Sequence, residues 1–281
     1  MNCFYCHNEG QTKSYQPDMT FEQFLQIMDE AKKFGLRSIT FTGGEPLLAK
    51  DFSKMLNWTV DNLESVDVCT NAILVPDFIS ELSDSKKINL TIGIDTCNVD
   101  KISKQSDCGE IFSTIAKNLK LLTQNETKFN INSVYSGINK KEIEEITEFC
   151  LSNKFDLRII ELDTYLFKNT GLTTPEFKSL IDHICNKFQL EVGYAHPGKG
   201  YFGMSKNNVK VNFYNAKCHT RDCANCAKCM FRIDSLGRAV PCYCRKERID
   251  LLLDNPQEAY KNFLKAIYLL GLPPEKDLFL V

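Results

Sequence analysis

The stretch Met1-Asn2-Cys3-Phe4-Tyr5-Cys6-His7-Asn8-Glu9-Gly10 is the starting point for interpreting the fold. Cys3 and Cys6 form a Cys-x-x-Cys pair at the beginning of a chain of otherwise ordinary composition. Taken alone, such a pair is compatible with zinc binding, with redox chemistry or with chance. A thioredoxin-like redox motif would open a helix at once, whereas a loop intervenes here. The pair is therefore interpreted together with the motifs that follow it.

A second motif, Thr42-Gly43-Gly44-Glu45-Pro46, follows a β-rich run. Paired glycines allow the backbone to approach a ligand closely, and Glu45 offers an acceptor for an ammonium group. The motif lies at the carboxyl end of an expected parallel strand, where α/β enzymes place their active sites. In isolation the pentapeptide also fits a simple turn with a solvated glutamate.

The overall composition excludes several classes of partner. The 281 residues carry a formal net charge of −2, which gives no electrostatic case for a nucleic-acid or membrane partner. No apolar run approaches the ~20 residues of a membrane span, and the first residues lack the shape of a signal peptide. We therefore expect a cytoplasmic protein.

Cysteine usage is the unusual feature of the composition. The chain has 13 cysteines, and an odd count in a reducing compartment argues against a disulfide framework. Eight of them fall in two clusters: Cys3, Cys6, Cys218, Cys223, Cys226, Cys229, Cys242 and Cys244. The remaining five are interpreted as small buried hydrophobic residues: Cys69, Cys97, Cys108, Cys150 and Cys185.

Hydrophobic periodicity predicts strands that alternate with helices through the first half of the chain. The expected strands span residues 38–42, 66–70, 88–95, 129–135 and 157–162. The expected helices begin at the capping box of Thr20 and Gln23 and continue at 51–63, 76–82, 110–122 and 141–150. This alternation predicts βαβ units and a parallel sheet. The chain begins in a loop that would normally follow a strand, so we expect a first strand before Met1.

The pattern changes after residue 174. We expect a helix at 176–188, short strands at 190–194 and 209–214, a hairpin around Gly237 and a last helix at 257–270. The predicted fold is an α/β, partial (βα)6 barrel over residues 1–168. A small α+β domain is expected over residues 169–281.

The two N-terminal motifs together resemble the radical S-adenosylmethionine (SAM) superfamily. Its signature is C-x-x-x-C-x-x-C after the first strand and G-G-E-P after the second. The resemblance implies a [4Fe–4S] cluster held by three thiolates, with one iron open to the amino and carboxylate groups of SAM. It also implies reductive cleavage of SAM to a 5′-deoxyadenosyl radical.

The resemblance assigns roles to individual residues. Cys3 and Cys6 match the second and third cluster ligands, and Tyr5 matches a position beside the adenine. The remaining implied SAM contacts are Gly43, Gly44, Glu45, Thr70, Asn71, Asp95 and Asn132.

The first cysteine of the triplet lies outside the given sequence. By the signature spacing, it is expected two positions before Met1, which makes the given start internal to a longer chain. The alternative is a degenerate metal-binding domain without catalysis.

Within the superfamily the chain is most similar to the GTP cyclase of molybdenum-cofactor biosynthesis and its relatives. The matching segments are Gly43–Lys50, Asn132–Val134, Arg158–Glu161 and Cys226–Cys229, followed by Arg232, Gly237 and Cys242. In those relatives a C-terminal twitch domain holds an auxiliary cluster. Cys226, Cys229 and Cys242 fit its ligands, with Cys223, Cys218 or Cys244 available as a fourth. A structural zinc site is the alternative.

The chain departs from the cyclase at cationic positions that a triphosphate requires. Thr40, Asn130 and Met230 stand where the cyclase has Arg or Lys, and its C-terminal glycine tail is absent. Arg158 and Arg232 are kept as candidate substrate contacts. We therefore expect a radical SAM enzyme acting on an unidentified small molecule or peptide, reduced by flavodoxin or ferredoxin. GTP cyclisation remains the alternative function.

Overall fold

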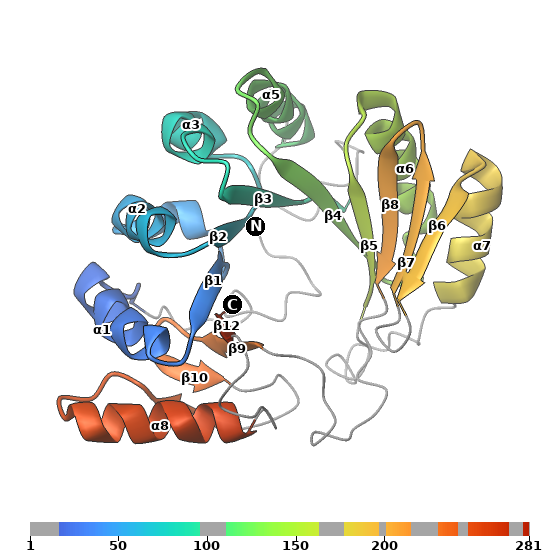
Figure 1. The fold of residues 1–281 in the computed structure, drawn as a ribbon. Coiled ribbons are helices and arrows are strands. Elements are labelled where there is room, and N and C mark those ends of the chain that lie inside the picture. Colours follow the sequence, from blue (N-terminus) through green and yellow to red (C-terminus); the bar gives the residue numbers. More distant parts are fainter. Residues whose placement is uncertain are drawn as a thin grey trace. The chain divides into compact units, whose positions relative to one another are not determined.

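The computed structural model describes residues 17–95, 111–162, 177–196, 201–214, 230–240, 247–269 and 278–280. The helices in Figure 1 are α1 (Phe21–Lys32), η2 (Pro46–Leu48), α2 (Phe52–Asn62), α3 (Val75–Ser83), α5 (Ile111–Gln124), α6 (Lys140–Asn153), α7 (Phe177–Phe188) and α8 (Pro256–Leu269). The first strands are β1 (Leu36–Phe41), β2 (Ser65–Thr70), β3 (Ile88–Gly93), β4 (Phe129–Tyr135), β5 (Leu157–Glu161) and β6 (Glu191–His196). The later strands are β7 (Tyr201–Lys206), β8 (Val209–Tyr214), β9 (Met230–Ile233), β10 (Arg238–Val240), β11 (Ile249–Asp250) and β12 (Leu278–Leu280).

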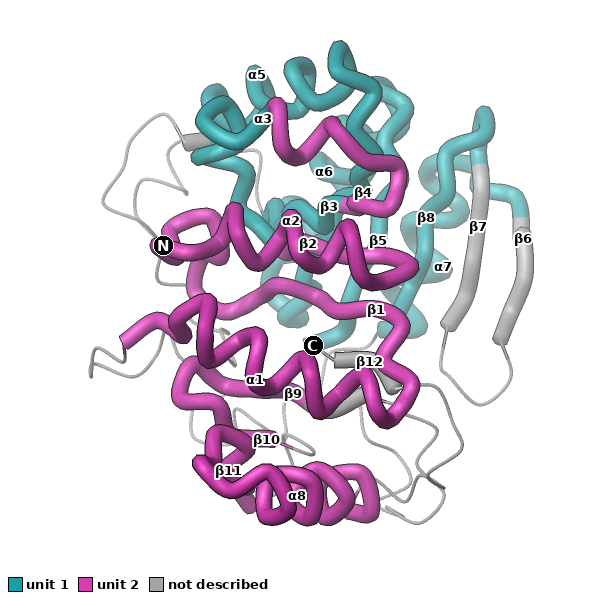
Figure 2. The backbone as a smooth tube through the Cα atoms, turned by 60° about the vertical axis from the view of Figure 1, so that its left-hand side comes forward, with its two compact units in different colours: residues 1–11, 70–79, 90–218 teal, residues 12–69, 80–89, 219–281 magenta. Residues whose placement is uncertain are grey.

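The chain divides into two compact units, each built from separate stretches of sequence (Figure 2). Unit 1 contains residues 1–11, 70–79 and 90–218. Unit 2 contains residues 12–69, 80–89 and 219–281. The predicted domain boundary at 168/169 stays a prediction.

In unit 2 the strand order is β11-β10-β9-β12-β1-β2. β12 pairs in parallel with both β9 and β1, and β1 pairs in parallel with β2. β9, β10 and β11 pair antiparallel. The capping box of Thr20 and Gln23 begins α1 as predicted. The backbone N–H of Gln23 donates to the Thr20 hydroxyl, and the backbone N–H of Thr20 donates to Oε1 of Gln23. Gly237, at φ +72°, occupies the predicted hairpin turn between β9 and β10.

In unit 1 the strand order is β3-β4-β5-β8-β7-β6, with β3 contributing from Leu90 onward. β3, β4, β5 and β8 are parallel neighbours, and β8, β7 and β6 pair antiparallel. The strands β4 and β8 agree with their predicted ranges to the residue. The fold class is therefore confirmed: parallel α/β strands with antiparallel strands later in the chain.

In β4, β5 and β8, successive side chains alternate between the two faces of the sheet, and polar residues alternate with fully buried apolar ones. Ile131, Leu157, Ile159, Val211 and Phe213 are fully buried. Helix α6 packs against β4, β5 and β8, and Phe177 of α7 packs against Phe213 with ring centroids 6.2 Å apart. The apolar face is thus the helix-covered core, which leaves the polar face available for a site.

Candidate functional site

A row of residues crosses the polar face of unit 1 at one level. Gly93 of β3 pairs in register with Asn132 of β4, Asn132 with Arg158 of β5, and Arg158 with Asn212 of β8. Register partners on parallel strands point to the same side of a sheet, and neighbouring strands are about 4.8 Å apart. We call these four residues the polar row. It brings together Asn132 and Arg158, two residues that the sequence had singled out.

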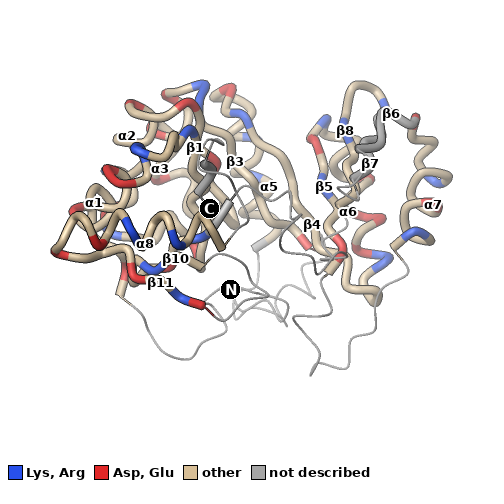
Figure 3. Tube along the Cα trace, turned by 60° about the horizontal axis from the view of Figure 1, so that its bottom comes forward, with Lys and Arg blue, Asp and Glu red and all other residues tan. Residues whose placement is uncertain are grey.

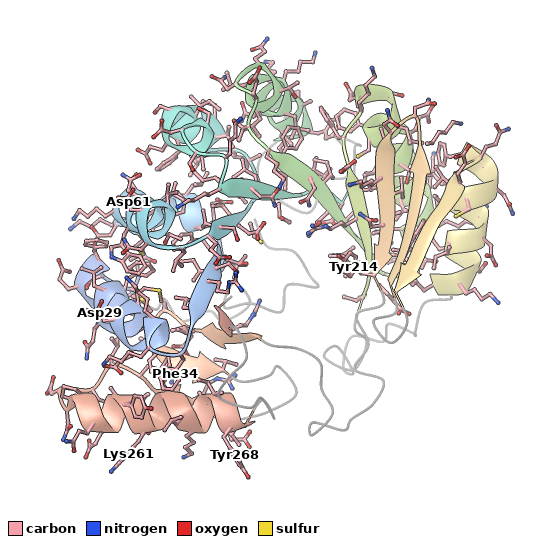
Figure 4. All side chains as sticks on the ribbon, in the orientation of Figure 1. Asp29, Phe34, Asp61, Tyr214, Lys261 and Tyr268 are labelled. Carbon is pink, nitrogen blue, oxygen red and sulfur yellow. The ribbon has the colours of Figure 1, made fainter. Side chains whose placement is uncertain are left out.

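Arg158 is oriented within this row by an aromatic ring. Its guanidinium carbon lies 6.0 Å from the ring centroid of Tyr214, two residues beyond Asn212 on β8. Figure 4 shows Tyr214 at the end of β8, on the side of the strand away from α7. No acidic side chain of the described residues forms an ion pair with Arg158. A guanidinium held in this way is prepared to bind an anionic group.

Asn132 also has a neighbour on its own strand. Asn130 donates a hydrogen bond from Nδ2 to Oδ1 of Asn132, over 3.1 Å. This part of the polar face therefore carries two amides.

Two predicted SAM contacts lie at the end of β2: Thr70 is its last residue, and Asn71 begins the loop that follows. Thr70 is 5% exposed, and its hydroxyl accepts a hydrogen bond from the N–H of Ala72 over 3.0 Å. Asn71 Oδ1 accepts from the N–H of Ile73 over 2.9 Å. Ala72 takes a positive φ of 62°, an uncommon conformation for a residue with a Cβ. These turns fix the backbone at the end of the strand.

Asn118 of α5, which was not predicted as a site residue, holds this loop in place. It is 5% exposed and donates from Nδ2 to the carbonyls of Ala72, over 2.7 Å, and of Ile73, over 3.2 Å. The sequence did contain a signal, because Asn118 lies between Ile115 and Leu122 on the apolar face of its helix. A polar residue at a core position requires a partner.

Replacing Asn118 with Ala is expected to weaken SAM binding by loosening this loop. One buried and one part-buried carbonyl lose their donor, which should cost about 1–3 kcal/mol of unfolding free energy. The measurements are urea unfolding and the dissociation constant for SAM. Asn125→Ala, one residue past the end of α5, is the control, since Asn125 is exposed and its side chain donates to the carbonyl of Leu121. Equal SAM affinities for the two variants would contradict the role of Asn118.

Asp95 follows β3 and is half-buried. Its Oδ1 accepts a hydrogen bond from the N–H of Val134 over 2.8 Å, which ties the end of β3 to β4. Burial raises the pKa of this carboxyl to about 6, while the hydrogen bond from Val134 acts in the opposite direction. A partly buried carboxylate at a strand end is a suitable acceptor for hydroxyl or ammonium groups of a ligand.

The raised pKa of Asp95 predicts a pH dependence of stability. Because the folded pKa lies above the model value of 3.8, the folded state binds more protons. The contribution of Asp95 to stability is therefore largest below about pH 4, falls as the pH rises to about 6, and is constant above. A shift of this size corresponds to at most about 3 kcal/mol. Asp95→Asn, which keeps an acceptor for Val134, should remove this slope in urea unfolding measured from pH 4 to 7.

A second strand-end carboxylate provides the control for that experiment. Asp156 accepts a hydrogen bond from the N–H of Lys210 over 2.9 Å. Asp156→Asn should retain the slope between pH 4 and 6. Its disappearance in this variant, or its persistence in Asp95→Asn, would show that another group is responsible.

In unit 2, the Gly-Gly-Glu-Pro motif forms an open turn after β1. Gly43 has a φ of +131°, which side chains with a Cβ rarely adopt. No heavy atom of the described chain lies within 4 Å of a Cβ built on Gly43 or on Gly44. Glu45 accepts from the N–H of Leu47 over 3.3 Å and caps η2. This open backbone beside a half-buried carboxylate fits the amino end of SAM.

The remaining predicted site residues are placed less fully. Arg232 is a half-buried residue of β9 in unit 2, where it pairs in register with Val240. The others lie outside the described residues: Tyr5, Cys3, Cys6, Cys218, Cys223, Cys226, Cys229, Cys242 and Cys244. Within the described part of the chain, no group of three His, Cys, Asp or Glu side chains is placed to hold a metal ion.

Two further features of the described helices concern their charge distribution and their capacity to span a membrane. Lys and Arg are interspersed with Asp and Glu along the helices, as Figure 3 shows for α6 and α7. Among the described helices, none combines the length and the apolar character that a membrane span requires.

The fold and these motifs define a family, and comparison with known proteins identifies it. The Radical SAM superfamily model matches residues 1–150, so the chain belongs to this superfamily. Its cofactors are accordingly SAM and a [4Fe–4S] cluster.

Curated relatives within this superfamily carry a more specific name. A protein named "Probable GTP 3′,8-cyclase" from Methanosarcina mazei is 30% identical over 254 residues, which are 86% of this chain and 73% of the relative. One of the same name from Methanocaldococcus jannaschii is 26% identical over 89% of this chain and 83% of its own length.

Solved structures share the fold. Streptococcus suis SuiB bound to SAM superposes with a TM-score of 0.66 at 18% identity, over 89% of this chain. The chain spans 60% of the SuiB chain. The protein anSMEcpe with bound SAM gives a TM-score of 0.65 at 18% identity, over 97% of this chain and 77% of its own.

Proposed function

We propose that this protein reductively cleaves SAM and uses the 5′-deoxyadenosyl radical to abstract hydrogen from a substrate bound at the polar row. The observation that carries the proposal is the family match over residues 1–150, which contain both the Cys3–Cys6 pair and the Gly-Gly-Glu-Pro motif. The open turn at Gly43 and Gly44 supports it from the structure.

The chain's own residues divide into three proposed roles. Cys3 and Cys6 hold the cluster together with one further thiolate, and Tyr5 lies beside the adenine. When bound, the cluster supplies the electron and the open iron that radical formation requires. Glu45 and the Gly43–Gly44 backbone orient the methionyl amino group. Thr70, Asn71, Asp95 and Asn132 contact the rest of SAM, and Arg158 and Arg232 contact the substrate.

The C-terminal cysteines have a separate proposed role. Cys226, Cys229 and Cys242, with Cys223 as the favoured fourth ligand, hold an auxiliary cluster within a twitch-like domain spanning residues 169–281. Flavodoxin or ferredoxin supplies the electron. Iron analysis distinguishes this assignment from zinc: about eight iron atoms per chain indicate two [4Fe–4S] clusters, and about four indicate one.

The proposed reaction is tested by product analysis. Anaerobically reconstituted protein is mixed with SAM and dithionite, and 5′-deoxyadenosine and methionine are quantified by chromatography. We expect both products in equal amounts, and none without reductant. Absence of 5′-deoxyadenosine from protein with a full complement of iron would refute the proposal.

GTP 3′,8-cyclisation is the second candidate, favoured by the names of the relatives and by their coverage of most of the chain. The amides at Asn130 and Asn132 argue against it, because a buried triphosphate needs fixed cations. Adding GTP to the same assay decides between them. Consumption of GTP together with SAM would establish the cyclase reaction.

A further inference from the structure

Asn212, a residue with no role in the sequence-based interpretation, carries a buried acceptor without a partner. The residue is 8% exposed, and its Oδ1 atom accepts no hydrogen bond. No described residue makes a hydrogen bond with its Nδ2 atom either. A buried amide left unpaired costs stability, so it persists in proteins where another group supplies the missing bond.

The position of Asn212 indicates which kind of group supplies the missing hydrogen bond. It is the last member of the polar row, one strand beyond Arg158 and two strands beyond Asn132. Its side chain therefore faces the same side of the sheet as that of Arg158, from a neighbouring strand whose backbone is about 4.8 Å away. The neighbouring positions on β8, Val211 and Phe213, face the opposite, fully buried side.

We propose that Asn212 is a specificity-determining substrate contact, whose Oδ1 accepts a hydrogen bond from an N–H or O–H beside an anionic group held by Arg158. This inference rests on the proposed function and extends it to the substrate class. A guanidinium next to an amide acceptor matches a carboxylate with an adjacent N–H, the arrangement in an N-acylated amino acid or a peptide terminus. Arg158 is the one cation among the residues of the polar row, and one cation beside neutral amides suits one carboxylate better than a triphosphate.

The smallest probe with this chemistry is N-acetylglycine, which has one carboxylate and one neighbouring amide N–H. N-acetylsarcosine is its matched control, because a methyl group replaces that hydrogen. Dissociation constants are measured by ligand-observed NMR on the full chain, with neither SAM nor reductant. We expect N-acetylglycine to bind at least about tenfold more tightly than N-acetylsarcosine.

Two variants of the protein complete the test. Asn212→Leu should reduce the affinity ratio of the probes to about one, and its melting temperature should equal or exceed that of the wild type. Asn130→Leu is the matched substitution at a buried but partnered amide, and it should lower the melting temperature. This contrast distinguishes a substrate contact from a structural residue.

Three outcomes would overturn the inference: no binding of either probe, an unchanged ratio in Asn212→Leu, or a melting temperature that falls as far in Asn212→Leu as in Asn130→Leu. The test is independent of the proposed reaction. If the protein distinguishes the two probes but forms no 5′-deoxyadenosine, the Asn212 contact is supported and the proposed SAM cleavage is refuted.

Discussion

Replacing Cys6 with Ala is expected to abolish 5′-deoxyadenosine formation. Three thiolates hold a [4Fe–4S] cluster of this type, and removing one leaves an iron atom without its ligand. The loss should exceed the roughly 10–100-fold typical for mutation of an outer-shell partner of a metal ligand. The measurements are product formation and iron content, which should fall by about four atoms per chain.

Cys150 provides the matched control for this substitution. It lies fully buried on α6, among apolar residues of unit 1. Cys150→Ala should lower the melting temperature through lost packing while leaving iron content and product formation intact. If Cys6→Ala kept its iron and its activity, the N-terminal pair would not be a cluster site.

Replacing Gly43 with Ala is expected to produce the second-largest effect. The positive φ of 131° makes any Cβ unfavourable, at a cost of about 1–3 kcal/mol in unfolding free energy. The added methyl group would also occupy the open space that the turn presents. Displacing SAM from its reactive position should reduce the rate of its cleavage by about 10²-fold. The rate of 5′-deoxyadenosine formation and the dissociation constant for SAM measure both effects.

Gly35 separates backbone strain from ligand binding. It lies in the turn between α1 and β1 with a φ of +74°, and no heavy atom of the described residues lies within 4 Å of its would-be Cβ. Gly35→Ala should therefore lower stability by about 1–2 kcal/mol without changing SAM affinity. A comparable loss of SAM affinity in both variants would mean that strain alone explains the Gly43 result.

The sequence predicted the helices and strands well where the signal, such as hydrophobic alternation or a capping box, lies within the element itself. The strict alternation of Val209, Val211 and Phe213 with polar residues located β8 to the residue, and Thr20 with Gln23 located the start of α1. Strand β12 was missed because three residues, Leu278–Leu280, carry no periodic signal. Its pairing with β1 joins the two ends of the sequence, which no local pattern encodes.

The candidate site was predicted only in part for the same reason. Motif spacing identified Gly43, Asp95 and Arg158 without showing what surrounds them. Asn212 became a candidate only through the strand register and its unpaired acceptor, which depend on tertiary structure. The cluster ligands, which rest on motif spacing alone, stay predictions.

The most direct test of the central claim is electron paramagnetic resonance of the reduced protein with and without SAM. If the Cys3–Cys6 site holds a [4Fe–4S] cluster with one open iron, binding of the amino and carboxylate groups changes that iron's ligands. We expect the g-values of the reduced cluster to shift on addition of SAM, and we expect no such shift in Cys6→Ala. A fully loaded cluster whose spectrum does not respond to saturating SAM would contradict it.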